Sequence, residues 1–220
     1  GKTEQYIGFE QKGKLITFNP KSHVRMFPSF QPEADGVTFH LKAVYTDTLR
    51  NEYSKEHSTH PIRMSRICGP VEVVNDTTFT VRFYRMGLDN PKRTGGICLM
   101  ASVKQDHKYR SAVQQVEIRI PYRNKEGIPQ RIIFPKLSDV KASVKEISLN
   151  GTADSGLPVY YYVKEGPAEI KGDKLVLTKI PPRAKFPVKV TVVAWQYGRS
   201  GEPKVQTAEA VEQSFYITAR

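Results

Sequence analysis

Helical periodicity is almost absent from this 220-residue chain. Short alternating runs rich in Val, Ile, Tyr, Phe and Thr are separated by Gly, Pro, Asn and Asp, which is typical of β-strands joined by turns. No apolar run approaches the length of about 18 residues that a membrane-spanning helix needs, and no signal peptide is visible. The sequence therefore predicts an all-β chain without membrane insertion. Because the chain opens with Gly1 rather than Met, we expect a processed or recombinant fragment from which any targeting sequence has been removed.

Cysteine is scarce, with only Cys68 and Cys98 in the chain. Two cysteines are too few for a disulfide-dense scaffold, and neither lies in a CxxC or another metal-binding spacing. A single disulfide between them is one alternative. Strand alternation places Cys98 on the outward face and Cys68 nearer the inward face. Because bonded cysteines need Cβ atoms that face each other, this parity favours free thiols.

Metal-binding and catalytic patterns are lacking as well. His57 and His60 have a ligand spacing only on a helix, and they lie in the polar insertion "TDTLRNEYSKEHSTH" (46–60), so we interpret them as surface histidines. The segments "NDTT" (75–78) and "LDNP" (88–91) are interpreted as turns rather than calcium sites. No G-x-S-x-G elbow is present. We therefore predict no metal, no cofactor and no enzymatic activity.

Positive charge is in excess, because 34 Lys and Arg residues against 22 Asp and Glu residues give a net charge of +12. Such a charge can attract nucleic acid, anionic glycans or lipid headgroups. Here the basic residues alternate with acidic ones and no nucleic-acid-binding motif appears, which indicates a solvated surface and no nucleic-acid partner. The basic loops "GLDNPKRTGG" (87–96) and "PPRAKFP" (181–187) are interpreted as solvated connections, with contact to an anionic partner as the alternative.

An internal repeat organises the chain. The predicted strands are 14–18, 37–45, 62–68, 78–84, 97–103 and 113–120, followed by 130–134, 145–152, 159–164, 174–180, 186–197 and 211–218. The two sets match in order: "LITFNP" answers "RIIFPK", "ICGPVEVVNDTTFTV" answers "KEGPAEIKGDKLVL", and "ICLMAS" answers "VTVVAW". A period of about 100 residues fits tandem β-sandwiches. The stretch 121–129 has Pro, Gly and charge but no apolar period, so we predict domains over 1–124 and 125–220.

The second repeat contains "QRIIF" (130–134), "ADSGLPVYY" (153–161), "GPAEIKGDKL" (166–175) and "EQSF" (212–215). This series resembles bacterial immunoglobulin-like modules over residues 130–218. The first repeat lacks Ser-Gly-Leu-Pro and carries the longer insertion, so its membership follows mainly from the internal repeat. The resemblance implies two tandem immunoglobulin-like β-sandwiches. It also implies a non-catalytic role in secreted, periplasmic or cell-surface bacterial proteins, often beside glycan-processing or adhesive domains.

Alternation divides the strands of the second repeat into two faces. The inward residues are Val159, Tyr161, Val163, Val188, Val190, Val192, Ala194, Phe215 and Ile217. Immunoglobulin order makes 159–164, 186–197 and 211–218 one sheet. Five aromatic residues then share its outer face and are called the aromatic stripe: Tyr160, Tyr162, Trp195, Tyr197 and Tyr216. The first repeat has no such stripe.

Exposed aromatic faces suit contact with a neighbouring domain, stacking on sugar rings, or plain cross-strand pairing. We favour contact with a neighbouring domain, which is either the first repeat or a part of the parent protein outside this sequence. The predicted function is therefore a spacer, docking or presentation module of a secreted or surface bacterial protein, with an accessory role in glycan processing left open. The alternative is a carbohydrate-binding module that uses the aromatic stripe, with glycan as the partner. A third hypothesis, an enzyme fragment with an active site between the domains, finds no convergent acid, base and nucleophile in the sequence.

Overall fold

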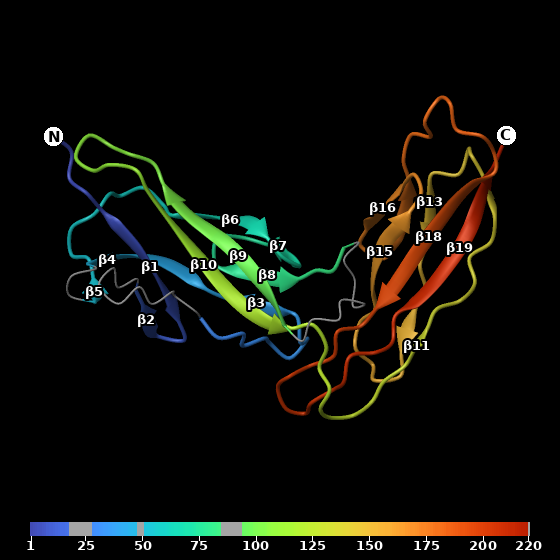
Figure 1. Ribbon diagram of the computed structural model, residues 1–220, viewed down its shortest axis with the longest axis horizontal. Helices are drawn as coiled ribbons and strands as arrows, with labels where there is room; N and C mark the ends of the chain where they lie inside the picture. Colours follow the sequence, from blue (N-terminus) through green and yellow to red (C-terminus); the bar gives the residue numbers. More distant parts are fainter. Residues whose placement is uncertain (18–27, 48–50, 85–93, 220) are drawn as a thin grey trace. The chain divides into compact units, whose positions relative to one another are not determined.

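The computed structural model describes residues 1–17, 28–47, 51–84 and 94–219. Every regular element in these residues is a β-strand, and the chain forms two compact units (Figure 1). Unit 1 comprises the described residues of 1–82 and 94–122. Unit 2 comprises Phe83, Tyr84 and 123–219. Unit 2 thus includes Phe83, Tyr84, Arg123 and Asn124. The domain boundary expected from the sequence places these four residues in the first domain.

Unit 2 is an immunoglobulin-like β-sandwich. Its strands are β11 (Ile132–Ile133), β12 (Val140–Lys141), β13 (Glu146–Ser148), β14 (Thr152–Ala153), β15 (Tyr160–Glu165), β16 (Ala168–Lys171), β17 (Lys174–Leu177), β18 (Val188–Trp195) and β19 (Val211–Thr218). The sheets have the orders β12-β19-β18-β15, β13-β17-β16 and β11-β14. The first contains the C, F and G strands of an immunoglobulin domain, and the other two together supply A, B, E and D. The predicted sheet with β18 at its centre is confirmed.

The core of unit 2 lies between these sheets. On β18 the side chains of Val190, Val192 and Ala194 are fully buried, as the alternation predicts. Phe215 and Ile217 of β19 join them in the same cluster, with Tyr161 of β15. The Tyr161 hydroxyl accepts a hydrogen bond from the Gly151 N–H (2.8 Å) and donates one to the Leu149 carbonyl (3.3 Å). These bonds satisfy the polar end of a tyrosine that is otherwise in apolar surroundings.

Unit 1 repeats this arrangement with additions. Its strands are β1 (Tyr6–Gln11), β2 (Lys14–Ile16), β3 (Thr38–His40), β4 (Lys42–Asp47), β5 (Glu52–Tyr53), β6 (Arg63–Cys68), β7 (Val71–Val73), β8 (Thr78–Val81), β9 (Thr94–Val103) and β10 (Ala112–Pro121). The sheet β10-β9-β6 corresponds to β19-β18-β15, and β3-β8-β7 corresponds to β13-β17-β16. The additional strands β2 and β5 extend the third sheet, β2-β1-β4-β5. All-β tandem immunoglobulin-like sandwiches are therefore the fold of this chain.

The Gly-Pro turn shared by the two repeats has the same structure in both. Gly69 has φ +95° and Gly166 has φ +102°, a region open to glycine but not to other residues without strain. A Cβ on Gly69 would lie 2.3 Å from the Gly96 carbonyl oxygen, and one on Gly166 would lie 2.6 Å from the Lys189 carbonyl oxygen. Each turn therefore needs glycine for both its dihedral angle and its close approach to the next strand.

The first strand of unit 1 differs from the prediction. The sequence matched "LITFNP" to "RIIFPK", but β1 pairs with β4 as β11 pairs with β14. Ile7 and Phe9 of β1 are buried like Ile132 and Phe134, so the I-x-F of residues 7–9 is the true counterpart. Gly8 concealed this strand because glycine weakens strand patterns. Here a Cβ on Gly8 would lie 2.6 Å from Thr46 Cγ2 and 2.9 Å from the Ile16 carbonyl oxygen.

No helix among the described residues has the length and apolar character to cross a membrane.

Candidate functional site

The aromatic stripe is the feature that the sequence singled out, and unit 2 buries most of it. Tyr160 lies opposite Trp195 in the β15–β18 register, and their rings are tilted at 32° with centroids 4.9 Å apart. Trp195 and Tyr197 are fully buried, and Tyr162 is 7% exposed. The expectation of an exposed stripe is therefore wrong for these three residues. Tyr160 is half-buried and Tyr216 is exposed.

Phe83 covers this face. Its ring meets the edge of Trp195 at 87° with centroids 5.1 Å apart, and it meets Tyr197 at 47° and 5.6 Å. Such edge-to-face pairs contribute about 0.5–1.5 kcal/mol beyond the area that they bury. Phe83 is only 2% exposed. Phe83, which follows β8 in the first repeat, therefore covers the buried part of the stripe. We call the four packed rings of Phe83, Tyr160, Trp195 and Tyr197 the aromatic cluster.

Sequence reasoning missed Phe83 as a functional candidate. Phe79, Val81 and Phe83 occupy alternate positions of the predicted strand 78–84. β8 ends at Val81, and Phe79 and Val81 are buried in unit 1, while Phe83 packs in unit 2. Alternation gives the side on which a residue lies but not the unit that receives it. No signal in the sequence distinguished Phe83 from Phe79 and Val81.

Backbone hydrogen bonds hold the second half of the aromatic cluster. The Tyr197 carbonyl accepts bonds from Asn124 Nδ2 (2.9 Å) and from Thr207 Oγ1 (2.5 Å). Burial raises the pKa of the Tyr197 phenol, so it stays protonated at neutral pH. Trp195 Nε1 is buried and has no hydrogen-bond partner among the described residues. The cluster is therefore held by ring packing and backbone anchors and has no titrating group near neutral pH.

The remaining outer face of this sheet is ionic. Lys164 pairs with Glu212 (2.5 Å) and Lys189 pairs with Glu165 (2.9 Å). Thr191 Oγ1 donates a hydrogen bond to Glu165 Oε1 (2.7 Å). The hydrogen bond from Thr191, followed by that from Lys189, holds the pKa of the Glu165 carboxyl below its usual value. Exposed pairs of this kind contribute little to stability, so they mark a solvated surface.

The Ser-Gly-Leu-Pro segment that carried the family resemblance is a structural turn. Ser155 Oγ donates a hydrogen bond to Gln130 Oε1 (2.5 Å) and accepts one from the Leu157 N–H (3.2 Å). Gln196 Nε2 donates to the Pro158 carbonyl (2.8 Å), and Gln130 and Gln196 are both buried. The serine is thus engaged in fixing the turn, and its neighbours provide no catalytic base.

The two cysteines face each other, which the sequence did not predict. β6 and β9 pair from Arg63↔Ser102 to Arg66↔Leu99, and the register then shifts by one residue so that Cys68 lies opposite Cys98. This β-bulge inserts Ile67 and turns Cys68 from the inward face to the outward face. Both cysteines are free thiols here, with Cys68 exposed and Cys98 half-buried. Regular alternation had placed them on opposite faces.

His57 and His60 of the insertion are both exposed, as predicted. His57 stacks on Tyr45 with centroids 4.1 Å apart, and its Nδ1 lies 2.7 Å from the Ser58 carbonyl oxygen. The Tyr45 hydroxyl donates a hydrogen bond to the His60 carbonyl (2.7 Å). Within the described residues, no three His, Cys, Asp or Glu side chains are grouped to hold a metal ion.

The predicted turn at 75–78 is confirmed, because Asn75 Oδ1 accepts a hydrogen bond from the Thr77 N–H (2.9 Å). Neighbouring Asp76 instead accepts a bond from the Met64 N–H (2.8 Å) and pairs with Arg63. That N–H bond and the Arg63 guanidinium hold the pKa of Asp76 below its usual value. The segment 88–91 lies outside the described residues.

One acid–imidazole–hydroxyl series occurs on the surface of unit 1. His40 Nε2 lies 3.2 Å from Glu33 Oε1, and His40 Nδ1 lies 3.3 Å from Thr78 Oγ1. The last contact follows from strand pairing, since His40 and Thr78 are register partners. Glu33 and His40 are both more than half exposed, so water competes for every bond. A catalytic hydroxyl also needs preorganised oxyanion donors, and we assign no catalytic role to this series.

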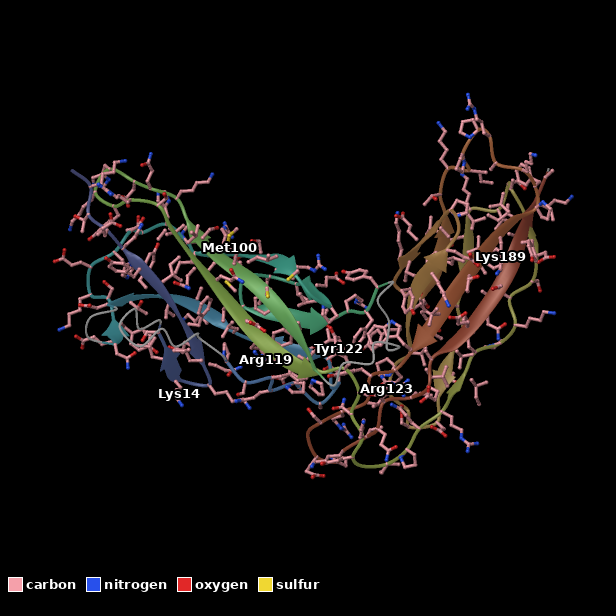
Figure 2. All side chains as sticks on the ribbon, viewed as in Figure 1. Lys14, Met100, Arg119, Tyr122, Arg123 and Lys189 are labelled. Carbon is pink, nitrogen blue, oxygen red and sulfur yellow. The ribbon has the colours of Figure 1, made fainter. Side chains whose placement is uncertain are left out.

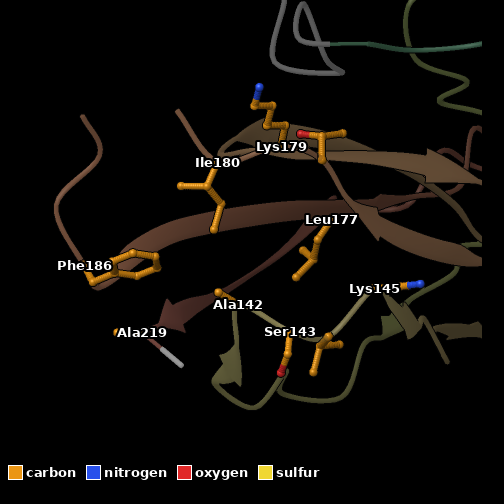
Figure 3. A pocket seen from close by; sticks show the side chains of 10 residues that line it. Ala142, Ser143, Lys145, Leu177, Lys179, Ile180, Phe186 and Ala219 are labelled. Atoms are coloured by element: carbon orange, nitrogen blue, oxygen red, sulfur yellow. The ribbon is translucent and has the colours of Figure 1, made fainter. Parts of the chain in front are cut away.

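A shallow groove of about 680 Å³ lies at one end of unit 2 (Figure 3). Leu177, Ile180 and Phe186 give it an apolar lining, and Lys145 and Lys179 lie at its rim. The remaining lining residues are Ala142, Ser143, Val144, Thr178 and Ala219. No acid, histidine or cysteine lines the groove, so it has no general base. The groove adjoins the basic loop 181–187. Residues 87–93 of the corresponding first-repeat loop lie outside the described residues.

Comparisons with known proteins do not assign a family. No protein-family model matches the chain, and no curated protein matches it. Solved structures that match include human protocadherin-24 EC1-2, at 12% identity and TM-score 0.33 over 88% of this chain and 94% of that one. Mouse cadherin-23 EC22-24 matches at 16% identity and TM-score 0.28 over 98% and 65%.

Drosophila N-cadherin EC1-4 matches at 11% identity and TM-score 0.31, over 88% of this chain and 47% of that one. Because these TM-scores are below 0.5, no argument rests on the likenesses. The immunoglobulin-like fold stands on the strand order described above, and the bacterial origin implied by the sequence resemblance stays a prediction.

Proposed function

We propose that this chain is a non-catalytic interaction module of a secreted or surface-attached bacterial protein, acting as a spacer or presentation unit for neighbouring domains. The observation that carries the proposal is the closed aromatic cluster, in which Phe83 covers Trp195 and Tyr197. The aromatic face, which is the strongest candidate binding surface in the sequence, is occupied by the chain itself. Its role is therefore structural.

The path of the chain supports a spacer role. The chain enters unit 2 at Phe83, returns to unit 1 for β9 and β10, and enters unit 2 again at Arg123. Arg123 is anchored there by a bidentate pair with Glu209 (2.6 and 3.0 Å). Unit 2 therefore includes Phe83, a residue of the first repeat, in its own packing.

The carbohydrate-binding alternative has little support. Sugar rings stack on exposed aromatic faces, and Trp195 has no exposed surface. Tyr216 is 42% exposed, but it lies near the ionic end of the sheet, where its N–H donates to Asp139 Oδ1 (2.8 Å). A single tyrosine beside charged pairs is a poor sugar platform. We therefore propose neighbouring domains, rather than glycans, as the partners.

A glycan array with titration of Trp195 fluorescence tests the proposal. The intact chain should bind no glycan, and the emission of its only tryptophan should be unchanged by oligosaccharides. Binding that is lost in Trp195→Ala but retained in Phe186→Ala, an exposed aromatic of the same unit, would contradict it. Turnover of any glycosidic or ester substrate would contradict the non-catalytic assignment.

A further inference from the structure

We propose that Cys68 and Cys98 form a site for reversible thiol–disulfide exchange, closing into a cross-strand disulfide on the outer face of unit 1. Two observations of the structure carry this inference, which goes beyond the proposed spacer role and does not depend on it. They are the register of β6 and β9, and the equivalent pair in unit 2.

The register brings the two side chains to one face. After the bulge at Ile67, Cys68 and Cys98 are direct partners in the antiparallel pair of β6 and β9. Side chains directly opposite on neighbouring antiparallel strands have Cβ atoms about 4.5–5.5 Å apart. The nearby Cys68 thiol also contributes, after burial, to the raised pKa of the Cys98 thiol. A disulfide between them therefore needs only small side-chain and strand adjustments.

Unit 2 shows independently that these two positions meet. β15 and β18 have the same register shift, between Val163 and Glu165. Glu165 precedes Gly166 as Cys68 precedes Gly69, and Thr191 occupies the position of Cys98 in the repeat. The Thr191 hydroxyl donates a hydrogen bond to the Glu165 carboxylate (2.7 Å). The bulge thus turns the corresponding side chains toward each other in both units.

Exposure makes the pair accessible to a small aliphatic disulfide such as oxidised glutathione. The exposed Cys68 thiolate attacks this disulfide and forms a mixed disulfide, releasing one glutathione thiolate. The Cys98 thiolate then attacks Cys68 Sγ, forming the Cys68–Cys98 bond and releasing the second glutathione thiolate. In total two protein thiols lose two protons and two electrons, and one glutathione disulfide is reduced to two thiols.

The environment of Cys98 controls the rate of the second step, in which Cys98 attacks Cys68 Sγ. Burial, then the nearby Cys68 thiol, raises the pKa of the Cys98 thiol to about 11. At neutral pH Cys98 is therefore protonated, and ring closure should speed up as the pH rises toward that pKa. The closed form is expected to persist in oxidising compartments and to open in reducing ones.

Ring closure should stabilise unit 1. β6 is an edge strand of the sheet β10-β9-β6, and the bond ties it to the central strand β9. The ring of residues 68–98 also contains β7, β8 and Phe83. Closing a loop of about 30 residues removes freedom from the unfolded chain, which raises the melting temperature of unit 1 by about 5–15 °C.

Incubation of the full chain with oxidised glutathione, followed by intact mass and non-reducing peptide mapping, tests the proposal. We expect a loss of two hydrogen atoms, a linked peptide pair containing Cys68 and Cys98, the rise in melting temperature, and reversal by dithiothreitol. Cys98→Ser should stop at a stable mixed disulfide on Cys68, whereas Cys68→Ser should react slowly and form no ring, because the Cys98 thiol is half-buried and protonated at neutral pH. The double variant Ile67→Cys with Cys68→Ser moves the thiol onto the bulged residue and should not form the ring.

Two results would overturn the proposal. One is a native chain that carries two stable glutathione adducts, or that keeps both thiols, while no Cys68–Cys98 peptide forms. The other is ring formation in the double variant at the wild-type rate, which would mean that the register does not select the pair. Folding of every variant is checked by circular dichroism, so that failure to form the ring is distinguished from failure to fold.

Discussion

β9 and β18 are the central strands of equivalent sheets, and they bury the same alternate positions on their inner sides. The residues fully buried there are Ile97, Leu99 and Ala101 on β9 and Val190, Val192 and Ala194 on β18. Their outer sides differ. Met100 on β9 is 36% exposed (Figure 2), whereas its counterpart Val193 on β18 is 1% exposed. The same outward position is therefore open in unit 1 and covered in unit 2.

The difference arises from what lies over each face. In unit 2, Phe83 and Tyr160 pack on Trp195, and Val193 lies opposite Tyr162 of β15 and Glu212 of β19. In unit 1 the same face has the thiol pair and Met100. The direction in which a side chain points is a local property of its strand, but the residues that cover it are distant in the sequence. Equivalent outward positions are therefore exposed beside two thiols in unit 1 and packed against aromatic rings in unit 2.

Trp195→Ala is expected to have the largest effect on this comparison. It empties a fully buried site and should lower the free energy of unfolding of unit 2 by about 4 kcal/mol. Ser102, the counterpart of Trp195 in the repeat, is half-buried, and Ser102→Ala should cost under about 0.5 kcal/mol. Urea unfolding is followed by circular dichroism, because the first variant has no tryptophan. Equal losses would remove the distinction between the two faces.

Phe83→Ala should destabilise unit 2 by about 3 kcal/mol, although Phe83 follows a strand of unit 1, because it opens a cavity against Trp195 and Tyr197. The matched control is Phe186→Ala, which truncates an exposed ring of unit 2 and should have an effect below about 0.5 kcal/mol. The transition is measured by urea unfolding of each variant. A loss confined to unit 1 would show that Phe83 belongs to the first domain.

The Gly-Pro turns test where the units are alike. Gly69→Ala and Gly166→Ala should each cost about 2–3 kcal/mol, because the added Cβ meets a backbone carbonyl at a positive φ. Gly172→Ala is the control, since its φ is +65° but no atom lies within 4 Å of the added Cβ, and it should cost about 1 kcal/mol. Thermal unfolding of the three variants gives the order of their losses in stability. A harmless Gly69→Ala with a costly Gly166→Ala would contradict the structural equivalence.

The smallest effects come from the equivalent outer positions of β9 and β18. Val193→Ala should cost about 2 kcal/mol, because two buried methyl groups are lost. Met100→Ala should cost under about 0.5 kcal/mol, because that side chain already contacts water. Chemical denaturation of both variants under one set of conditions gives the difference. If Met100→Ala is the costlier change, the outer face of unit 1 is covered as well.

Much of the architecture could be predicted from the sequence. The tandem sandwiches followed from the internal repeat and the family resemblance, and the sheet around β18 followed from immunoglobulin strand order. The inward set of Val190, Val192 and Phe215 followed from period-2 alternation, which a half-buried strand imposes locally. β1 was missed because Gly8 interrupts that pattern, and the facing of Cys68 and Cys98 was missed because a bulge adds one residue to a strand. Neither the strand around Gly8 nor the bulge at Ile67 has a side-chain pattern that reveals it in the sequence.

The candidate site was only partly predictable for a related reason. The outward parity of Tyr160, Tyr162 and Trp195 followed from alternation, but their exposure did not, because Phe83 comes from more than 70 positions earlier in the chain. Sequence alternation reports the direction of a side chain relative to its own sheet. Whether that side chain meets water, a ligand or another part of the chain depends on long-range packing.

Acrylamide quenching of Trp195 fluorescence in the wild-type chain and in Phe83→Ala tests the central claim most directly. Trp195 is the only tryptophan, so the signal reports the aromatic cluster alone. We expect weak quenching and blue-shifted emission in the wild type, and stronger quenching with a red shift in Phe83→Ala under conditions where the variant stays folded. Strong quenching in the wild type, unchanged by the substitution, would contradict a closed aromatic cluster and would make the stripe an exposed surface again.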